Sequence, residues 1–199
     1  MFASNAKAEE ILRTAIDAVQ QGGEDLFETL DALEAPIYVT DAEGLITHYN
    51  QACIGFAGRL PTVGEDRWCV TWKLYTDQGA ALPHDQCPMA VAIRKKIPVR
   101  GDLAVAERPD GTRVNFMPFP TPLLGEDGTL VGAVNMLVDV TDIREIAQLW
   151  AEAHRCRRLA AGAGDRKTAE DINRLAMEYD ARAAQLADEA GHALSIRRG

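Results

Sequence analysis

Apolar residues recur at helical spacing near both ends of the chain. Between residues 6 and 19 they fall three and four positions apart, which predicts an amphipathic helix that ends before Gly22-Gly23. A shorter helical pattern follows and ends before Pro36, because a proline disfavours helix at the residue that precedes it. After Thr141 two further helical patterns are separated by a break at residues 161–164. The pattern therefore predicts helices on both sides of a central region.

The central region has the short period of β-strands. Runs of β-branched and aromatic residues lie between turn-forming segments rich in Gly, Asp and Pro. Five runs are predicted as strands: 36–40, 45–49, 99–107, 112–123 and 129–139. Because most of the connecting turns are short, the strands are predicted to pair antiparallel. Pro118, Pro120 and Pro122 cannot donate to a ladder, which predicts a bulged or edge-like end for the fourth run.

The segment between the second and third predicted strands is less regular. Asn50 is placed to cap a short helix that follows the second strand. Residues 59–83 are predicted to form short irregular pieces. The segment 85–96 is predicted to be a helix that Asp85 caps, with Met89 and Ile93 on its inward side.

Four motifs in this order resemble the PAS domain family. Residues 36–50 are similar to its opening hairpin, including the Asp-x-x-Gly turn and the Asn that follows, and residues 108–113 are similar to a later turn. Residues 82–90 resemble a subgroup found beside bacterial histidine kinases, and Asp139-Val140-Thr141 resembles the closing Asp-x-Thr signature. The resemblance implies an α+β PAS fold: a five-stranded antiparallel sheet with short helices on one face around a small pocket, flanked by N- and C-terminal helices.

The resemblance also implies how the chain is divided and how it works. We expect an N-terminal helical arm at residues 1–24, a PAS domain at 25–142 and a C-terminal helical tail at 143–199. In the family, a signal in or near the pocket shifts the sheet, and the sheet passes the shift to the C-terminal helix. Asp139 and Thr141 lie where the last strand meets that helix, so they are the expected signal-relay residues.

Composition and charge narrow the classes of function. Of the 199 residues, 47% are hydrophobic and 26% are charged, as in chains that fold around a core. The net charge of −9 argues against a nucleic-acid surface. No apolar run is long enough to span a membrane and no signal peptide is recognisable, so we expect a cytoplasmic protein without membrane contact. The four cysteines form no CxxC pair, which indicates free thiols.

His84 and Cys87 form the most suggestive short motif. Both residue types ligate haem iron, so a haem site is one interpretation, and a helix start with a small buried thiol is the simpler one. Zinc at these residues and Cys69 would lack a fourth ligand, so no metal is expected. A flavin is another cofactor of the family, and Trp68 and Trp72 are able to stack on it, but tryptophans also fill cores. The first expectation is that no cofactor binds.

A ligand, if one binds, is expected between the helix at residues 85–96 and the inner face of the sheet. The candidate residues of this ligand pocket are apolar and fall on elements predicted to border that space: Trp68, Trp72, Met89, Ile93, Phe116 and Met136. Each of them is equally suited to filling the core.

Two classes of function remain open. The first is a sensor of a small molecule or redox signal that relays the signal through its tail to a partner or dimer mate. A haem-based sensor is a less favoured form of this class. The second is a ligand-free module for protein–protein interaction or dimerisation. No Gly-rich phosphate loop, nucleophile elbow or HExxH helix occurs, so we expect no enzyme. We expect a homodimer through arm and tail, with a histidine kinase or regulator of bacterial two-component regulation as the other class of partner.

Overall fold

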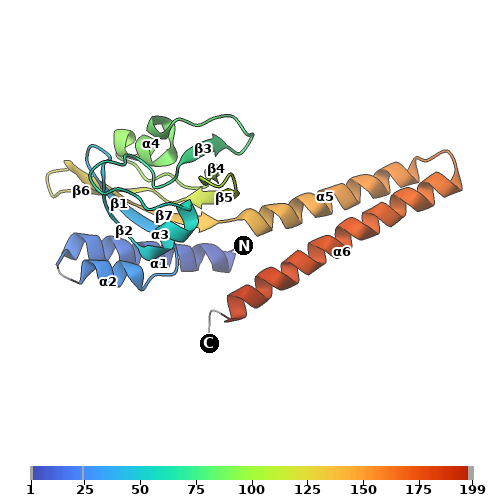
Figure 1. The fold of residues 1–199 in the computed structure, drawn as a ribbon, viewed down its shortest axis with the longest axis horizontal. Helices are drawn as coiled ribbons and strands as arrows, with labels where there is room; N and C mark the ends of the chain where they lie inside the picture. Colours follow the sequence, from blue (N-terminus) through green and yellow to red (C-terminus); the bar gives the residue numbers. More distant parts are fainter. Residues whose placement is uncertain (1, 24, 197–199) are drawn as a thin grey trace. The chain divides into compact units, whose positions relative to one another are not determined.

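The computed structural model describes residues 2–23 and 25–196, with side chains described at 7–23 and 25–188. The chain forms two compact units that divide between Asp139 and Val140 (Figure 1). The first unit holds a β-sheet with its covering helices, and the second is a pair of helices. The N-terminal helix falls in the first unit, although residues 1–24 were predicted to form an arm separate from the domain.

One antiparallel sheet forms the centre of the first unit. Its strands are β1 (Ile37–Asp41), β2 (Ile46–Tyr49), β3 (Lys73–Thr76), β4 (Ala104–Glu107), β5 (Arg113–Pro118), β6 (Thr121–Leu124) and β7 (Leu130–Asp139). They lie in the order β2-β1-β7-β5-β4-β3, and β6 also pairs with β7. The predicted α+β fold with antiparallel pairing is confirmed.

Within the described residues, seven strands form where five were predicted, for two reasons. The predicted strand at 112–123 is divided at Phe119-Pro120, because prolines cannot continue the ladder, so it becomes β5 and β6. The irregular connector after α3 contributes β3, which pairs with β4 and adds one strand at the edge of the sheet. The interruption that the prolines predicted is confirmed.

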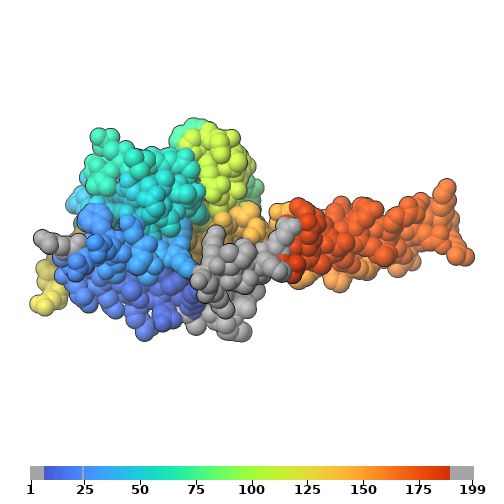
Figure 2. All heavy atoms as spheres, turned by 60° about the horizontal axis from the view of Figure 1, so that its bottom comes forward, coloured from blue at the N-terminus to red at the C-terminus, as the bar shows by residue number. Residues whose placement is uncertain are grey.

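Helices cover both faces of the sheet. Helices α3 (Gln51–Ala57) and α4 (Pro88–Lys95) lie on the face that we call inner, with the short 3₁₀ helix η1 (His84–Gln86) before α4. Helices α1 (Phe2–Gln21) and α2 (Leu26–Asp31) cover the opposite, outer face. Figure 2 shows these two helices, in blue, on the side of the first unit that faces the viewer. The short helices on one face were predicted, and the cover of the other face was not.

Helix α1 contributes to the outer core. Leu12 and Ala15 are buried among residues of β1 and β7 that include Ile37, Val134 and Met136. Burial of such side chains stabilises the attachment of α1 by about 1 to 3 kcal/mol each. The apolar face of α1 is therefore used inside the unit. The expected dimer contact through the arm stays a prediction.

Alternation along the central strands separates the two cores. Tyr38 faces the inner core, and its neighbours Ile37 and Val39 face the outer core. Strand β7 is buried from Gly132 to Leu137, because both of its sides are covered. A central strand with cover on both sides has no solvent-facing positions to mark its register in the sequence.

Asn50 is buried and joins three segments of the first unit. Its side-chain oxygen accepts a hydrogen bond from the Ile37 amide at 2.9 Å. Its side-chain nitrogen lies 3.0, 3.2 and 2.8 Å from the carbonyl oxygens of Leu30, Leu33 and Ala35. Asn50 occupies the N-cap position of α3 as predicted, but its side chain makes no cap hydrogen bond and holds the α2–β1 linker instead.

The second unit is a hairpin of α5 (Thr141–Ala161) and α6 (Arg166–Ile196). The break between the two predicted tail helices is confirmed, at Gly162–Asp165. Small side chains are buried between the helices, which lets them approach closely: Ala153, Cys156, Ala160, Ala176 and Ala183. An ion pair between Arg157 and Asp180 joins the helices across the hairpin. The tail helices thus bury only part of their apolar residues against each other, and Ile143 and Trp150 of α5 stay exposed. No helix in the described part of the chain is long and apolar enough to cross a membrane.

Candidate functional site

The inner core is filled where the ligand pocket was predicted. Met89 and Ile93 of α4 and Phe116 of β5 are 1%, 5% and 2% exposed, so almost no solvent-sized space adjoins them. The Phe116 ring packs edge-on against the ring of Phe56, with centroids 5.4 Å apart. These three residues act as core in this structure, which was the alternative interpretation of each.

Met136 lies on the other face of the sheet. It is buried in the outer core with Leu12 and Ile37, so it cannot line a space beneath α4. Its placement among the pocket residues was therefore wrong. The error is one of register, since Leu137, the next residue of β7, does face the inner core.

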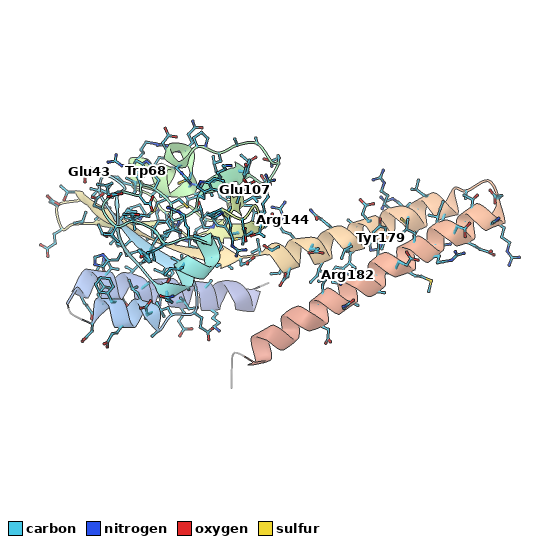
Figure 3. All side chains as sticks on the ribbon, viewed as in Figure 1. Glu43, Trp68, Glu107, Arg144, Tyr179 and Arg182 are labelled. Carbon is cyan, nitrogen blue, oxygen red and sulfur yellow. The ribbon has the colours of Figure 1, made fainter. Side chains whose placement is uncertain are left out.

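Trp68 lies at the centre of the irregular connector in a strained conformation. Its φ of 70° is left-handed, which is rare for a bulky side chain. The Trp68 amide donates to the Gly44 carbonyl at 2.8 Å, and the indole lies so close to Gly44 that a Cβ there would be 2.2 Å from the ring. Figure 3 shows Trp68 beside the β1–β2 turn, which carries Glu43. Only glycine at position 44 admits this contact.

A surface cleft of about 450 Å³ opens beside Trp68. It is lined by Arg59, Glu65, Asp66, Arg67, Trp68, Cys69, Thr71, Trp72, His84 and Asp85. It brings together three of the predicted site residues, Trp68, Trp72 and His84. Two other cavities, on the far side of α4 and near the end of α1, contain none of the predicted site residues. This cleft is therefore the candidate site.

One ion pair lies along the cleft. Arg59 forms an ion pair with Asp66 at 2.8 Å and donates to the Val70 carbonyl at 2.8 Å. Trp72 is 44% exposed, with the Lys73 ammonium 3.9 Å from its ring centroid. An indole that remains this accessible beside paired charges offers a flat ligand both a stacking surface and hydrogen-bonding groups.

His84 presents an unpaired polar atom in this region. Its Nε2 is buried and has no hydrogen-bond partner. Burial, and then the nearby Arg59 guanidinium, lower the pKa of His84, so the neutral imidazole is favoured. A buried unpaired nitrogen costs free energy, and such groups recur at functional sites.

Cys87 fits the simpler interpretation of the His-Cys motif. The residue is buried in the inner core at the N-cap of α4, and its thiol points to the Trp68 carbonyl oxygen at 3.9 Å. Burial raises the pKa of Cys87 to about 12, which disfavours the thiolate that a metal would require. Among the described residues no group of three or more His, Cys, Asp and Glu side chains is placed to hold a metal ion.

A buried chain of hydrogen bonds beneath the cleft was missed by the sequence analysis. The Tyr38 hydroxyl donates to the Trp68 carbonyl at 2.9 Å and accepts from the Asn135 side-chain nitrogen at 2.9 Å. The Asn135 side-chain oxygen accepts from the Phe119 amide at 2.9 Å. Tyr38 and Asn135 are almost fully buried, and burial raises the pKa of Tyr38 well above its usual range. An Asn inside an otherwise apolar strand was the only signal in the sequence.

The two expected relay residues flank the passage from sheet to helix. Asp139 ends β7, opposite Phe116 of β5, and Thr141 begins α5. Val140 occupies the N-cap position, and its carbonyl accepts the Arg144 amide at 3.0 Å as the first helical hydrogen bond. The relay role of Asp139 and Thr141 stays a prediction.

Comparisons with known proteins concern the fold. No protein-family model matches the chain, and no curated protein matches it. Among solved structures, the Rhodobacter sphaeroides LOV protein is 14% identical over 81% of this chain and 96% of its own, with a TM-score of 0.43. The LOV domain of the Erythrobacter litoralis EL346 blue-light activated histidine kinase is 21% identical over 55% and 98%, with a TM-score of 0.43. A PAS domain from Colwellia psychrerythraea is 19% identical over 57% and 92%, with a TM-score of 0.39.

The first unit contains the elements that the PAS motifs predicted. The opening hairpin, the connector with short helices, a longer helix and the later strands follow in that order. The strands pair as one antiparallel sheet. The first unit thus has the element order and the antiparallel sheet that the PAS resemblance predicted. A fold of this kind does not by itself define a signal or a ligand, which must be argued from the site.

Proposed function

We propose that the chain is a non-enzymatic sensory signalling module, in which the first unit receives a signal and β7 passes it to the α5–α6 hairpin. The observation that carries this proposal is the position of β7. It pairs with β1 on one side and with β5 and β6 on the other, and Val140 alone separates it from α5. A shift of this central strand moves the start of α5 directly, so two arrangements of the sheet give two states of the helix.

The signal that the cleft fits best is a small planar molecule with hydrogen-bonding groups. Trp68 and Trp72 offer aromatic surface, and the Arg59–Asp66 pair offers a donor and an acceptor at the same wall. The filled inner core supports a site at this cleft over one between α4 and the sheet. A thiol-based redox signal has less support, because burial raises the pKa of Cys87 to about 12 and so leaves little reactive thiolate.

Mass measurement of the intact protein tests the small-molecule signal. Native mass spectrometry and an absorption spectrum of the freshly purified chain are expected to show a bound organic compound that Trp72→Ala loses. Trp150→Ala is the matched control, since Trp150 of α5 is similarly exposed, at 50% against 44%. Equal retention of the compound by both variants would place its site elsewhere. A haem or flavin spectrum would identify a cofactor-based sensor instead.

The receiving partner that we propose for the hairpin is a second copy of the chain. Ile143 and Trp150 are 64% and 50% exposed and lie seven residues apart, on one side of α5. Light scattering coupled to size exclusion is expected to show a dimer that Trp150→Ser and Ile143→Ser dissociate. Val131→Ser, which changes a 61% exposed residue of β7, is the control that leaves the dimer intact. A monomeric wild-type chain would favour a kinase or regulator as the partner.

The second candidate function is a ligand-free interaction module. The close packing around Met89 and Phe116 favours it, because an inner core without space needs no ligand to complete it. The small-molecule sensor and the ligand-free module predict different results in the native mass spectrometry experiment. A dimer that carries no compound in any variant supports the ligand-free module.

A further inference from the structure

We infer that the buried hydrogen-bond chain from Trp68 through Tyr38 and Asn135 to Phe119 couples the cleft to strand β7. This inference rests on the proposed function, because it describes how a signal at that cleft reaches the relay strand. Neither Tyr38 nor Asn135 contacts the cleft itself. Both would act as positioning residues that carry a displacement from the connector to the centre of the sheet.

The Tyr38 and Asn135 side chains link Trp68 to Phe119 by consecutive hydrogen bonds. The Tyr38 hydroxyl has one proton, which it donates to the Trp68 carbonyl, and it accepts from the Asn135 side-chain nitrogen. The other end of the same side chain accepts from the Phe119 amide. Burial leaves no water to replace a lost partner, so a broken link strands a polar group at a cost. A displacement of the Trp68 carbonyl therefore either moves the Tyr38 and Asn135 side chains with it or breaks one of the hydrogen bonds between them.

The hydrogen-bond chain begins in the connector at Trp68, whose backbone is strained. Trp68 keeps its left-handed backbone while its amide bonds the Gly44 carbonyl and its ring lies on Gly44. Strained backbone of this kind persists only where the surroundings impose it. A ligand in the cleft that displaces the indole would release this restraint, and the Trp68 carbonyl would move with it.

The other end of the hydrogen-bond chain lies at Phe119, between the end of β5 and the start of β6. The Phe119 amide lies 2.9 Å from both the Asn135 side-chain oxygen and the Met136 carbonyl oxygen. Asn135 stands opposite Tyr38 in the β1–β7 register, four residues before Asp139. A change at Trp68 is thus delivered to the part of β7 that precedes α5.

Packing alone does not require these polar groups. On the other side of the same strands, Ile37 and Met136 face each other in register as an apolar pair. Phe and Leu at positions 38 and 135 would fill a similar volume, but they would leave the Trp68 carbonyl without its Tyr38 donor. The polar pair therefore serves the link between Trp68 and β7, which the pairing of the two strands does not need.

A cycle of two substitutions tests the coupling without knowledge of the ligand. Gly44→Ala introduces a Cβ that would lie 2.2 Å from the indole, so it displaces Trp68 as a ligand would. Tyr38→Phe removes the central hydroxyl and keeps the ring. Amide hydrogen exchange of Phe119 is measured by NMR in the wild type, both single variants and the double variant. We expect Gly44→Ala to accelerate Phe119 exchange about tenfold with Tyr38 present, and less than about twofold in the Tyr38→Phe background.

The Asn50 amide provides the internal control. It donates to the Ile37 carbonyl at 3.0 Å and takes no part in the chain, so it reports general opening of the domain. Equal acceleration of the Phe119 and Asn50 amides in both backgrounds would show a general loss of stability and overturn the inference. No acceleration at Phe119 would overturn it as well. Trp68→Phe replaces Gly44→Ala in the same cycle if the alanine variant does not fold.

This inference and the proposed function fail separately. If Phe119 exchange depends on Tyr38 but no compound binds in the cleft, the small-molecule signal is refuted and the coupling through the buried hydrogen bonds is supported. If Phe119 exchange does not depend on Tyr38 but a compound binds at Trp72, the sensor function is supported and this coupling is refuted.

Discussion

Two neighbouring residue pairs of the central strands face opposite sides of the sheet and differ in character. Ile37 and Met136 form an apolar pair beneath α1, whereas Tyr38 and Asn135 form a hydrogen-bonded pair beneath the connector. The contact of the outer pair is not directional, because apolar side chains adapt to small shifts. The hydrogen bond of the inner pair is directional and joins one particular donor to one particular acceptor. The difference teaches that the outer face holds a helix in place, while the inner face is built to transmit position.

The largest effect is expected at Asn50, which joins three segments of the first unit. Asn50→Ala leaves the Ile37 amide and the carbonyls of the α2–β1 linker without their partner, so we expect a loss of about 3 to 5 kcal/mol in the free energy of unfolding. Urea unfolding of the full chain measures it. The exposed Asn173→Ala of α6 is the control, expected within about 0.5 kcal/mol of the wild type. A loss below about 1 kcal/mol for Asn50→Ala would show that its bonds are dispensable.

The next effect is expected in the outer core. Met136→Ala opens a cavity beneath α1 and is expected to destabilise the fold by about 2 to 4 kcal/mol in urea unfolding. Val131→Ala, on the same strand but 61% exposed, is expected to change the free energy by less than about 0.5 kcal/mol. Similar values for the two variants would contradict the assignment of Met136 to a buried face.

A smaller effect is expected from His84 as the pH falls. Its pKa is lowered in the folded state by burial and by Arg59, so the unfolded chain binds the proton more readily. The stabilisation is therefore fully present above the unfolded pKa of about 6.5 and is lost as the pH falls toward the folded pKa. Urea unfolding at neutral and mildly acidic pH is expected to show a steeper loss for wild type than for His84→Gln.

The pH experiment needs a matched histidine. Burial also lowers the pKa of His48, on β2, so His48→Gln removes that separate contribution and leaves the one from His84. An unchanged pH dependence in His84→Gln would mean that its imidazole is freely solvated in the folded protein.

Much of the fold was predictable because its turns and prolines are local signals. The turn at Asp41–Gly44 and the prolines near Phe119 marked strand ends correctly. The faces of β7 were not predictable, because a strand buried on both sides shows no alternation, and Met136 was placed on the wrong side for that reason. Trp68, Trp72 and His84 were recognised by residue type and do share a cleft.

The buried chain could not be found from the sequence. Tyr38 and Asn135 are 97 residues apart, and their contact depends on the β1–β7 register and not on any local motif. The strained backbone of Trp68 likewise follows from its contact with a distant glycine. The cleft residues Trp68, Trp72 and His84 were recognisable from their residue types. The hydrogen-bonded pair beneath the cleft depends on the register between two strands that are distant in sequence.

Hydrogen exchange at the start of α5 tests the central claim most directly. Exchange of the segment that contains the Arg144 amide is measured by mass spectrometry in Tyr38→Phe and in Val39→Ala, its outer-face neighbour. We predict that Tyr38→Phe accelerates exchange there about threefold or more, although Val39→Ala costs the fold at least as much stability. Acceleration that follows overall stability, with Val39→Ala equal to or above Tyr38→Phe, would contradict a transmitting inner face.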